Sequence, residues 1–521
     1  MSALKQSDIK ARLLALSCKE RHAVLARATM VLFCLAVMIS AFEQLGINEY
    51  EMLLSVVFLC GTGIFFTPAL FLILFWMFFL PLMADLHLFL SYGLSLSSFG
   101  EQIFAVVCDT NKTEIIEYLA RIELFIWFSL IVMVFASSRV LFFRPEPAGI
   151  SRKQKTIIIG VILLMYPFTY VRHVYPIVLS KFSTEKNDMI SRSLAFRFNP
   201  VKQNKADTVV VLIGESHRQA EFGPVFDQYA SRFENLYRFT DMVAPFAGTL
   251  NAVQIILSRK KVSDLYDFFY EKSLFSLFRE AGYATYFLHY VNTSSELNGL
   301  SFIYREAGHF VKYEHKEEAR TDEGIYSVLD DILKNGERKK LIVIKMIGVH
   351  IDFRHRYPNP EVSFFRYMAS LFKPKTKKQE MYHYNKAVAY SAGIIANIME
   401  KVEKRPEPSL LFFSSDHGIC IFDKGSFHLP PNCRNAFHVP AMILLNPALA
   451  AMTPQQVKDN LACNTDKPLT GEYDFETVAA LAGISYPSAD EKYDLTKRCF
   501  PPEGRKRTVS TGNKKAFYED L

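Results

Sequence analysis

Two short segments, about two hundred residues apart, each run an apolar strand directly into side chains that bind metal ions. Residues 209–213 lead into Glu215, and residues 410–413 lead into Asp416 and His417. A run of four to six apolar residues is typical of a buried strand in an α/β sheet, where ligands and catalytic groups lie at the carboxyl ends of the strands. Carboxylate oxygens with an imidazole nitrogen suit zinc or manganese better than calcium. The pattern predicts one divalent metal ion held from both strand ends.

Thr249 follows a Pro/Gly turn and opens a stretch with helical periodicity. It is therefore expected at a helix N-terminus, where backbone N–H groups and the helix dipole favour negative charge. Most threonines in that position are only N-caps. Beside a metal ion, however, coordination lowers the pKa of a hydroxyl enough for it to attack phosphorus.

Three histidines are further candidates. His350 follows the apolar run at 341–347, and His428 comes eleven residues after His417. A single histidine is most often a surface or core residue, but two of them at strand exits or nearby loops are better explained as ligands of a donor phosphate or of a second metal ion. His438, which precedes Val439 and Pro440, is expected to contact the residues that bind the metal ion or phosphate rather than to bind either itself.

The elements that must position these residues alternate from residue 208 onward. We expect helices at 273–281, 323–333, 384–402 and 475–481, and strands at 209–213, 284–288, 341–347, 410–413 and 439–445. This βαβ rhythm predicts an α/β soluble domain with a mostly parallel sheet sandwiched between helices.

The N-terminal part of the chain differs sharply because apolar stretches dominate it. Five of them are candidate membrane spans, at residues 28–45, 52–66, 69–92, 122–143 and 156–170. About twenty apolar residues cross a bilayer as a helix, whereas a signal peptide is single, shorter and followed by a cleavage site. We therefore predict an α-helical transmembrane bundle of five spans over residues 1–172.

Lys and Arg residues near the ends of these stretches predict the orientation of the chain. They cluster before the first stretch and between the fourth and fifth, which places both segments in the cytoplasm. Five crossings put everything after about residue 172 outside, whereas four or six would put it inside. Residues 173–207 are expected to be a linker, either lying along the bilayer surface or packing as an ordinary connector. The catalytic domain follows at 208–500, and 501–521 is expected to be a mobile, basic and polar tail.

Cysteine usage agrees with an external soluble domain. Cys108 and the four cysteines after residue 400 would all face an oxidising compartment. Proximity suggests pairing Cys420 with Cys433 and Cys463 with Cys499, although connectivity cannot be read from sequence. The formal net charge of +7 favours anionic membrane surfaces, and we expect no nucleic-acid partner.

The motifs resemble those of a known family. Their order matches that in membrane phosphoethanolamine transferases, which belong to the alkaline phosphatase and sulfatase-like superfamily, and the resemblance covers nearly the whole chain. The residues that carry it are Gly214-Glu215-Ser216, Thr249, Gly348-Val349-His350, Ser415-Asp416-His417-Gly418, His428 and His438-Val439-Pro440.

The resemblance implies a role for each site residue. Glu215, Thr249, Asp416 and His417 would hold one zinc ion, with Thr249 as the nucleophile. His350 and His428 would contact the phosphate or a second zinc ion and could supply a proton to the leaving group, and His438 would contribute to substrate binding.

It also implies a reaction and a location. Phosphoethanolamine would pass from phosphatidylethanolamine to lipopolysaccharide, on an inner-core sugar or on lipid A. The enzyme would be a multi-pass protein of the inner membrane with its catalytic domain in the periplasm. Residues 348–358 resemble the branch that modifies the lipopolysaccharide core more than the lipid A branch.

The sequence departs from the family pattern at two places. Ile419 stands where many relatives have Glu after the Asp-His-Gly motif, which weakens the argument for a second metal ion. The cysteine-rich loops of the lipid A modifiers are missing from residues 289–320, which puts their substrate-binding lysine in doubt.

Three competing functions stay open. A phosphoglycerol transferase or a phosphohydrolase of the same superfamily would use the same site. A catalytically inactive membrane scaffold would have no need for tightly bound zinc. Thr249 argues against sulfatase activity, which needs an oxidised Cys or Ser in a Cys/Ser-x-Pro-x-Arg motif that is absent here. The acceptor group and the oligomeric state are not legible in the sequence.

Overall fold

The computed structural model describes residues 18–40, parts of 71–86, 124–143, 196–202, 205–262, 271–290, 306–314, 321–359, 376–423, 426–428, 433–501, 506–511 and 514–521. The chain divides into two compact units. Residues 1–103 and 121–183 form one unit, and residues 104–120 and 184–521 form the other.

The first unit contains two long helices, α2 (Cys18–Ser40) and α7 (Leu124–Phe143). The α2 helix overlaps the first expected span but begins ten residues before it, and α7 matches the fourth closely. They contact each other and share an apolar core with residues between 71 and 86. Among the described residues, no helix meets the length and hydropathy needed to cross a membrane. The expected spans at 52–66 and 156–170, most of the span at 69–92 and the linker up to residue 195 lie outside the described residues.

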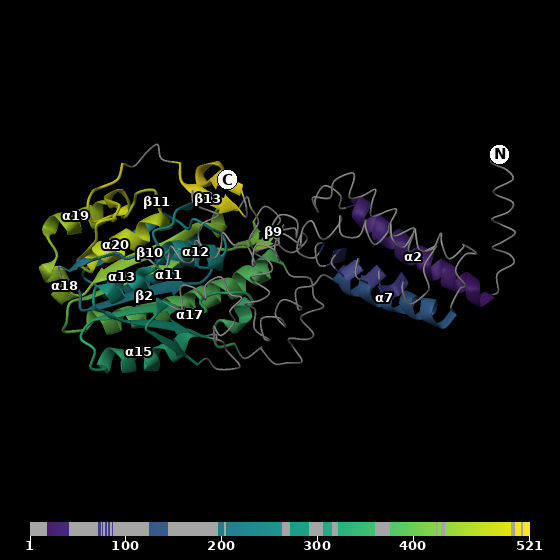
Figure 1. Cartoon of the computed structure of the whole chain (residues 1–521), viewed down its shortest axis with the longest axis horizontal. Coiled ribbons are helices and arrows are strands. Elements are labelled where there is room, and N and C mark those ends of the chain that lie inside the picture. The colour runs from purple at the N-terminus through teal and green to yellow at the C-terminus, as the bar shows by residue number, and fades with distance from the viewer. Residues whose placement is uncertain are drawn as a thin grey trace. The chain divides into compact units, whose positions relative to one another are not determined.

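The second unit is built on an eight-stranded sheet, and Figure 1 shows its strands surrounded by helices. In spatial order the strands are β11 (Leu469–Thr470), β3 (Leu236–Val243), β10 (His438–Leu445), β7 (Ser409–Ser415), β2 (Thr208–Gly214), β6 (Lys340–Lys345), β4 (Ala284–His289) and β5 (His309–Lys312). Among these described strands, only β10 runs against its neighbours. The prediction of a mostly parallel sheet is confirmed.

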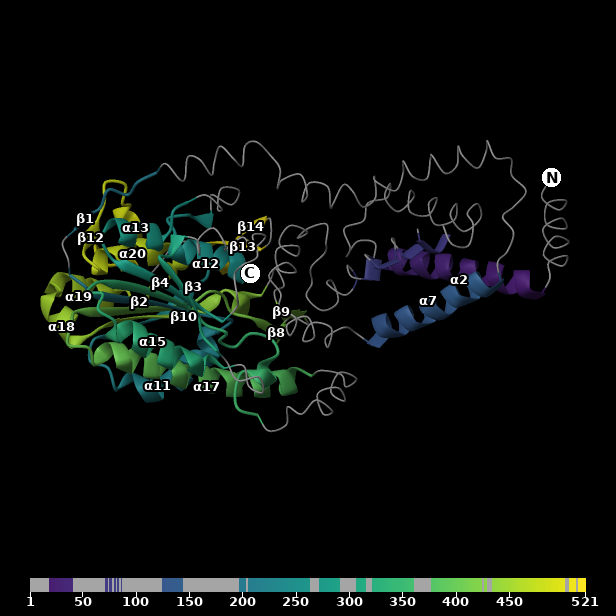
Figure 2. The same ribbon diagram turned by 60° about the horizontal axis from the view of Figure 1, so that its bottom comes forward.

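Helices cover both faces of this sheet (Figure 2). One layer contains α12 (Thr249–Leu257), α13 (Leu274–Glu280), α18 (Pro447–Met452), α19 (Gln455–Cys463) and α20 (Asp474–Leu481). The other contains α11 (Gln219–Ala230), α15 (Ile325–Lys334) and α17 (Lys377–Glu403).

The central strands are mainly apolar because each face meets a different helical layer. In β2, Val209, Val211 and Ile213 pack with the first layer, whereas Val210 and Leu212 pack with the second. All seven residues of β2 and all seven of β7 are buried. Two buried faces leave no place for water, so these strands read as continuous apolar runs.

The expected helices and strands of this domain are all present, but several elements were not anticipated, among them α11, β3, β5, α18 and α19. The α11 helix contains Gly223 and Pro224, a pair that usually indicates a turn. It forms nevertheless because Phe222 and Phe226 are buried in the second layer. The β3 strand carries Arg238, so its apolar pattern is too irregular to identify from sequence.

The C-terminal residues differ from the expected mobile tail. They form a two-stranded hairpin, β13 (Thr508–Thr511) and β14 (Lys514–Phe517). Arg507 is buried and lies 2.7 Å from carboxylate oxygens of both Asp241 and Glu519. The Ser510 N–H donates to the Pro245 carbonyl at 2.9 Å. These ion pairs, with the buried Val509 and Tyr518 side chains, explain why the segment is ordered.

Candidate metal centre

The two ligand-bearing strand ends lie side by side. β2 and β7 are parallel neighbours, and Gly214 pairs with Ser415 at their last positions. Glu215 and the Asp416-His417 pair therefore emerge at the same edge of the sheet. One ligand atom from each lies within 4.8 Å of the others, and all three residues are buried. The structure thus brings together the three residues that the sequence placed at two separate strand exits.

A tight turn aims Glu215 into this cluster. Ser216 has a φ of 61°, a conformation that non-glycine residues rarely adopt. Its hydroxyl donates to Glu215 Oε1 at 2.6 Å, and its N–H donates to Asp416 Oδ1 at 3.3 Å. The Tyr384 hydroxyl donates to the Ser216 carbonyl at 2.9 Å and accepts from the Arg218 N–H at 2.9 Å. These bonds hold the strained turn in place.

Thr249 is the first residue of α12 and follows the N-cap Gly248. Its hydroxyl donates to Glu215 Oε2 at 3.0 Å and lies 3.1 Å from His417 Nε2. His417 Nδ1 lies 2.6 Å from the Gly418 carbonyl, which can only accept, so Nδ1 carries the proton and Nε2 presents a lone pair. One hydroxyl proton thus faces two acceptors.

Lys345, the last residue of β6, is a fourth charged group in the cluster. Its Nζ lies 2.7 Å from Glu215 Oε2 and 3.1 Å from Asp416 Oδ2, and its side chain is only 3% exposed. Burial alone raises the pKa of Glu215, but nearby positive charge, that of Lys345 above all, lowers it well below its usual value. Burial and the charge of Glu215 raise the pKa of Asp416. Burial opposes protonation of Lys345, but Asp416 and Glu215 raise its pKa, so it stays cationic.

The arrangement fits a bound divalent cation. Carboxylate oxygens, an imidazole lone pair and a hydroxyl converge, and Thr249 has one proton to share among them. Asp416 Oδ2 accepts no hydrogen bond within the described part of the chain, although Lys345 faces it. Oxygen ligands with one nitrogen suit zinc. The residues in position to hold the ion are Glu215, Thr249, Asp416 and His417.

The loop after β6 carries His350 to the edge of the cluster. The Val349 N–H donates to the Glu215 carbonyl at 3.0 Å. Gly348 has a φ of 57°, and a Cβ at this position would lie 2.8 Å from the backbone of Glu215, so only glycine fits. His350 Nδ1 lies 2.7 Å from the Ile351 carbonyl, which fixes that nitrogen as the donor. The loop is thereby tied directly to a metal-binding residue.

The other two histidines are less closely tied to the cluster. His428 ends β9 (Ser426–His428), and its backbone pairs with Cys420 in β8 (Cys420–Asp423), but its side chain lies outside the described residues. His438 Nε2 lies 3.0 Å from the Thr240 carbonyl and 4.0 Å from Asp241 Oδ1. Burial lowers the pKa of His438. Within the described part of the chain, none of its contacts is with the cluster.

A sulfatase family model matches residues 207–484, more than half of the chain and the whole region that builds this centre. The chain belongs to the sulfatase family.

Relatives of this sulfatase-family chain include phosphoethanolamine transferase EptC of Escherichia coli O18:K1:H7 (strain RS218 / NMEC), which is 23% identical over 344 residues. The match covers 61% of this chain and 57% of EptC, so the chain spans a little over half the length of that relative.

Two solved structures share the fold. The C-terminal periplasmic domain of E. coli EptC, solved in complex with Zn, has a TM-score of 0.53 at 20% identity and covers 62% of this chain and 96% of that domain. The integral membrane protein lipooligosaccharide phosphoethanolamine transferase A of Neisseria meningitidis has a TM-score of 0.61 at 15% identity and covers 91% of this chain and 99% of that protein.

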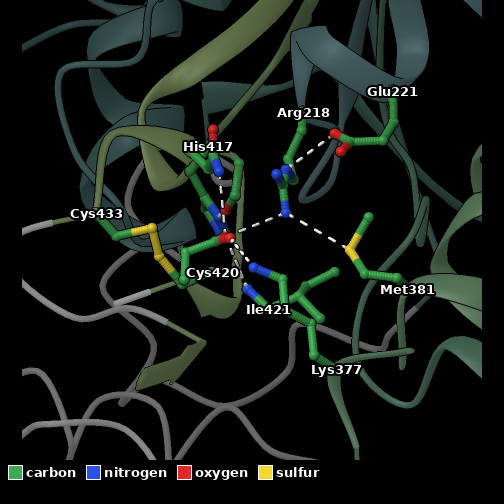
Figure 3. Close-up of a disulfide and its surroundings, with 11 residues drawn as sticks. Arg218, Glu221, Lys377, Met381, His417, Cys420, Ile421 and Cys433 are labelled. Atoms are coloured by element: carbon green, nitrogen blue, oxygen red, sulfur yellow. Dashed lines mark hydrogen bonds and ion pairs between the residues drawn. A yellow bond between two sulfur atoms is a disulfide. The ribbon is translucent and has the colours of Figure 1, made fainter. Parts of the chain in front are cut away.

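A disulfide closes the segment that carries His428 in this sulfatase-family domain. Cys420 is bonded to Cys433, and Cys463 to Cys499, which confirms both expected pairs. Figure 3 shows Arg218 and Lys377 near the first disulfide. Asp423 Oδ2 lies 3.3 Å from Arg218 Nη1, and Asp423 Oδ1 lies 2.8 Å from Lys377 Nζ. The hairpin of β8 and β9 is thus anchored to α11 and α17.

Several positioning residues were missed by the sequence analysis. Lys345 interrupts the apolar run at 341–347. Because a charge in a buried strand requires a partner, this lysine was the signal in the sequence that a carboxylate lies beside it. Tyr384 lies within an expected helix, where nothing indicates that its hydroxyl holds the Ser216 turn. Arg507 was assigned to the tail.

Proposed function

We propose that this chain transfers phosphoethanolamine from phosphatidylethanolamine to lipopolysaccharide through a phosphoethanolamine intermediate on Thr249. The observation that carries the proposal is the placement of the Thr249 hydroxyl, 3.0 Å from Glu215 and 3.1 Å from His417, at the N-terminus of α12. The relatives named phosphoethanolamine transferases support the transferred group.

In the first step, Thr249 Oγ1, having lost its proton to solvent, forms a bond to the phosphorus of the donor. The bond from phosphorus to the diacylglycerol oxygen breaks, and that oxygen takes a proton from His350 or His428. N–H groups of the first turn of α12 stabilise the phosphoryl oxygens as negative charge builds on them. Zinc held by Glu215, Thr249, Asp416 and His417 would supply the charge that lowers the pKa of the hydroxyl.

In the second step, an acceptor oxygen on lipopolysaccharide forms a bond to the same phosphorus and gives its proton to the histidine that protonated the first leaving group, and the bond from phosphorus to Thr249 Oγ1 breaks. We propose that the acceptor is on the inner core or on lipid A, with the core favoured by the residues that follow His350. We propose that one zinc ion serves both steps. Ile419 stands where many relatives have Glu, and it gives no support for a second ion.

Both substrates are lipids, and we propose that the chain is embedded in the inner membrane with five spans and its catalytic domain in the periplasm. The large apolar side chains exposed on α2 and α7 support this location; among them are Leu32, Phe128, Ile131 and Phe135. The two disulfides of the catalytic domain support an oxidising compartment.

The intact mass of the purified full chain after incubation with phosphatidylethanolamine tests the proposal. Wild type is expected to gain one phosphoethanolamine on Thr249, Thr249→Ser to gain it as well, and Thr249→Ala not to gain it. A phosphoglycerol adduct formed only with phosphatidylglycerol would overturn the donor. Absence of any adduct, together with absence of zinc in elemental analysis, would point to an inactive scaffold.

A further inference from the structure

The buried Lys345 contacts the same oxygens that a metal ion would use. Its Nζ donates to Glu215 Oε2, which also accepts the Thr249 hydroxyl. It forms an ion pair with Asp416 Oδ2, which accepts no hydrogen bond in the described part of the chain. A third bond, to the Gly214 carbonyl at 3.2 Å, fixes the ammonium group between the ends of β2 and β7. Lys345 therefore places its own positive charge beside the oxygens that would bind the metal ion.

Two buried carboxylates this close to each other need positive charge to remain ionised. Lys345 supplies one unit of it when no metal is bound. With a divalent ion and a Thr249 alkoxide added, the two carboxylates, Lys345, the ion and the alkoxide together carry no net charge. Without Lys345 the same set carries one negative charge, which favours the ion more strongly.

We propose that Lys345 is a built-in counter-ion of the metal centre. Its ammonium group holds Glu215 and Asp416 in their ligand positions before metal binds, and it weakens metal binding because it repels the ion. This inference rests on the proposed zinc site. Lys345 is then a positioning residue that stabilises the metal-free fold and lowers the affinity of the centre for the metal ion. Zinc would then bind to a preformed centre and remain exchangeable.

Lys340, at the other end of the same strand, provides a matched control. It is also about 3% exposed, but its Nζ donates to the carbonyls of Leu333 and Asn335, at 3.3 and 3.2 Å. Lys340→Met therefore removes a buried ammonium group from β6 without touching the two carboxylates, whereas Lys345→Met removes the one between them.

The experiment uses the metal-stripped full chain in detergent, with the melting temperature measured with and without zinc and zinc affinity measured by competition with a chelator. Lys345→Met is expected to lower the metal-free melting temperature by about 6 °C or more, because it leaves two buried charges unpaired. Zinc should restore it, and zinc affinity should rise at least about tenfold. Lys340→Met should also lower the melting temperature, but zinc should not restore it and zinc affinity should match wild type.

The outcomes separate this inference from the proposed function. If wild type binds no zinc, or binds it equally well after His417→Ala, the zinc site itself is wrong. If wild type binds zinc at this site but Lys345→Met binds it no more tightly, or more weakly, the counter-ion role is overturned and the proposed function stands. If Lys345→Met fails to fold without metal, refolding in zinc is expected to recover it, and failure to recover would also overturn the inference.

Discussion

Asp322 holds the loop that joins β6 to the metal centre, and replacing it with asparagine should impair both stability and transfer. The residue opens a 3₁₀ turn (Asp322–Gly324) and is buried. Its Oδ1 accepts from the Tyr313 hydroxyl at 2.7 Å and the Ile347 N–H at 2.8 Å, and its Oδ2 accepts from the Gly348 N–H at 2.8 Å. Asp322→Asn keeps the shape but puts an amide donor against one of these N–H groups.

The expected cost follows from that mismatch. One hydrogen bond is lost and a buried N–H is left without an acceptor, which costs about 1–3 kcal/mol. For a domain of this size the melting temperature should fall by roughly 2–10 °C. Because the next residue, Val349, donates to the Glu215 carbonyl, a shift of the Gly348 backbone reaches the metal centre. A displacement of about 1 Å can slow catalysis on the order of a hundredfold, so a tenfold or larger loss of transfer is expected.

Tyr313→Phe is the matched control. It removes the hydroxyl that donates to Asp322 and that also lies 3.1 Å from the Lys345 carbonyl. Both loop N–H bonds to Asp322 stay intact, so the change should cost about 1 kcal/mol and leave the rate of adduct formation near that of wild type. Melting temperature and the rate of adduct formation by intact mass are measured for both variants. An Asp322→Asn protein that melts and reacts like wild type, or a Tyr313→Phe protein that is equally slow, would refute the argument that these loop bonds position the centre.

Three further predictions concern other parts of the catalytic domain. Burial raises the pKa of Asp474 well above its usual value, and neither of its carboxylate oxygens has a hydrogen-bond partner in the described part of the chain. The folded chain therefore keeps a proton that the unfolded chain releases above about pH 4, so the stability of wild type falls as pH rises. The melting temperature of Asp474→Asn should match that of wild type near pH 4 and exceed it progressively toward pH 8. Deleting residues 506–521 removes the hairpin that bonds to Pro245 ahead of Thr249, and should lower the melting temperature and abolish the adduct on Thr249. A deletion variant that still forms the adduct at the wild-type rate would contradict a role of the hairpin in positioning Thr249. Replacing Cys420 and Cys433 with serine should cost roughly 2–4 kcal/mol and slow transfer, because it loosens the segment that carries His428; added reductant should slow wild type more than the double variant, which keeps the Cys463–Cys499 bond.

Much of the centre could be predicted from local sequence because its residues follow strands that are apolar on both faces. The runs at 209–213 and 410–413 are long enough to identify as buried strands, and parallel strands expose their carboxyl ends at one edge. Glu215, Asp416 and His417 were therefore predictable as neighbours. The N-terminal position of Thr249 follows from its turn and helical periodicity, whereas proximity only suggested the disulfide pairs, which the tertiary structure decided.

The tertiary structure alone decided how these parts are connected. The direction of β10 cannot be read from its own residues, because it depends on pairing with β3 and β7. The hairpin at the C-terminus has a Gly-Asn turn signal, yet its order depends on Arg507 reaching Asp241, 266 residues away. Lys345 reads in the sequence only as an interruption of a strand, and it becomes part of the centre because β6 pairs beside β2. Local patterns determine what each segment forms, whereas charge pairing and packing between distant segments determine which side chains share a site.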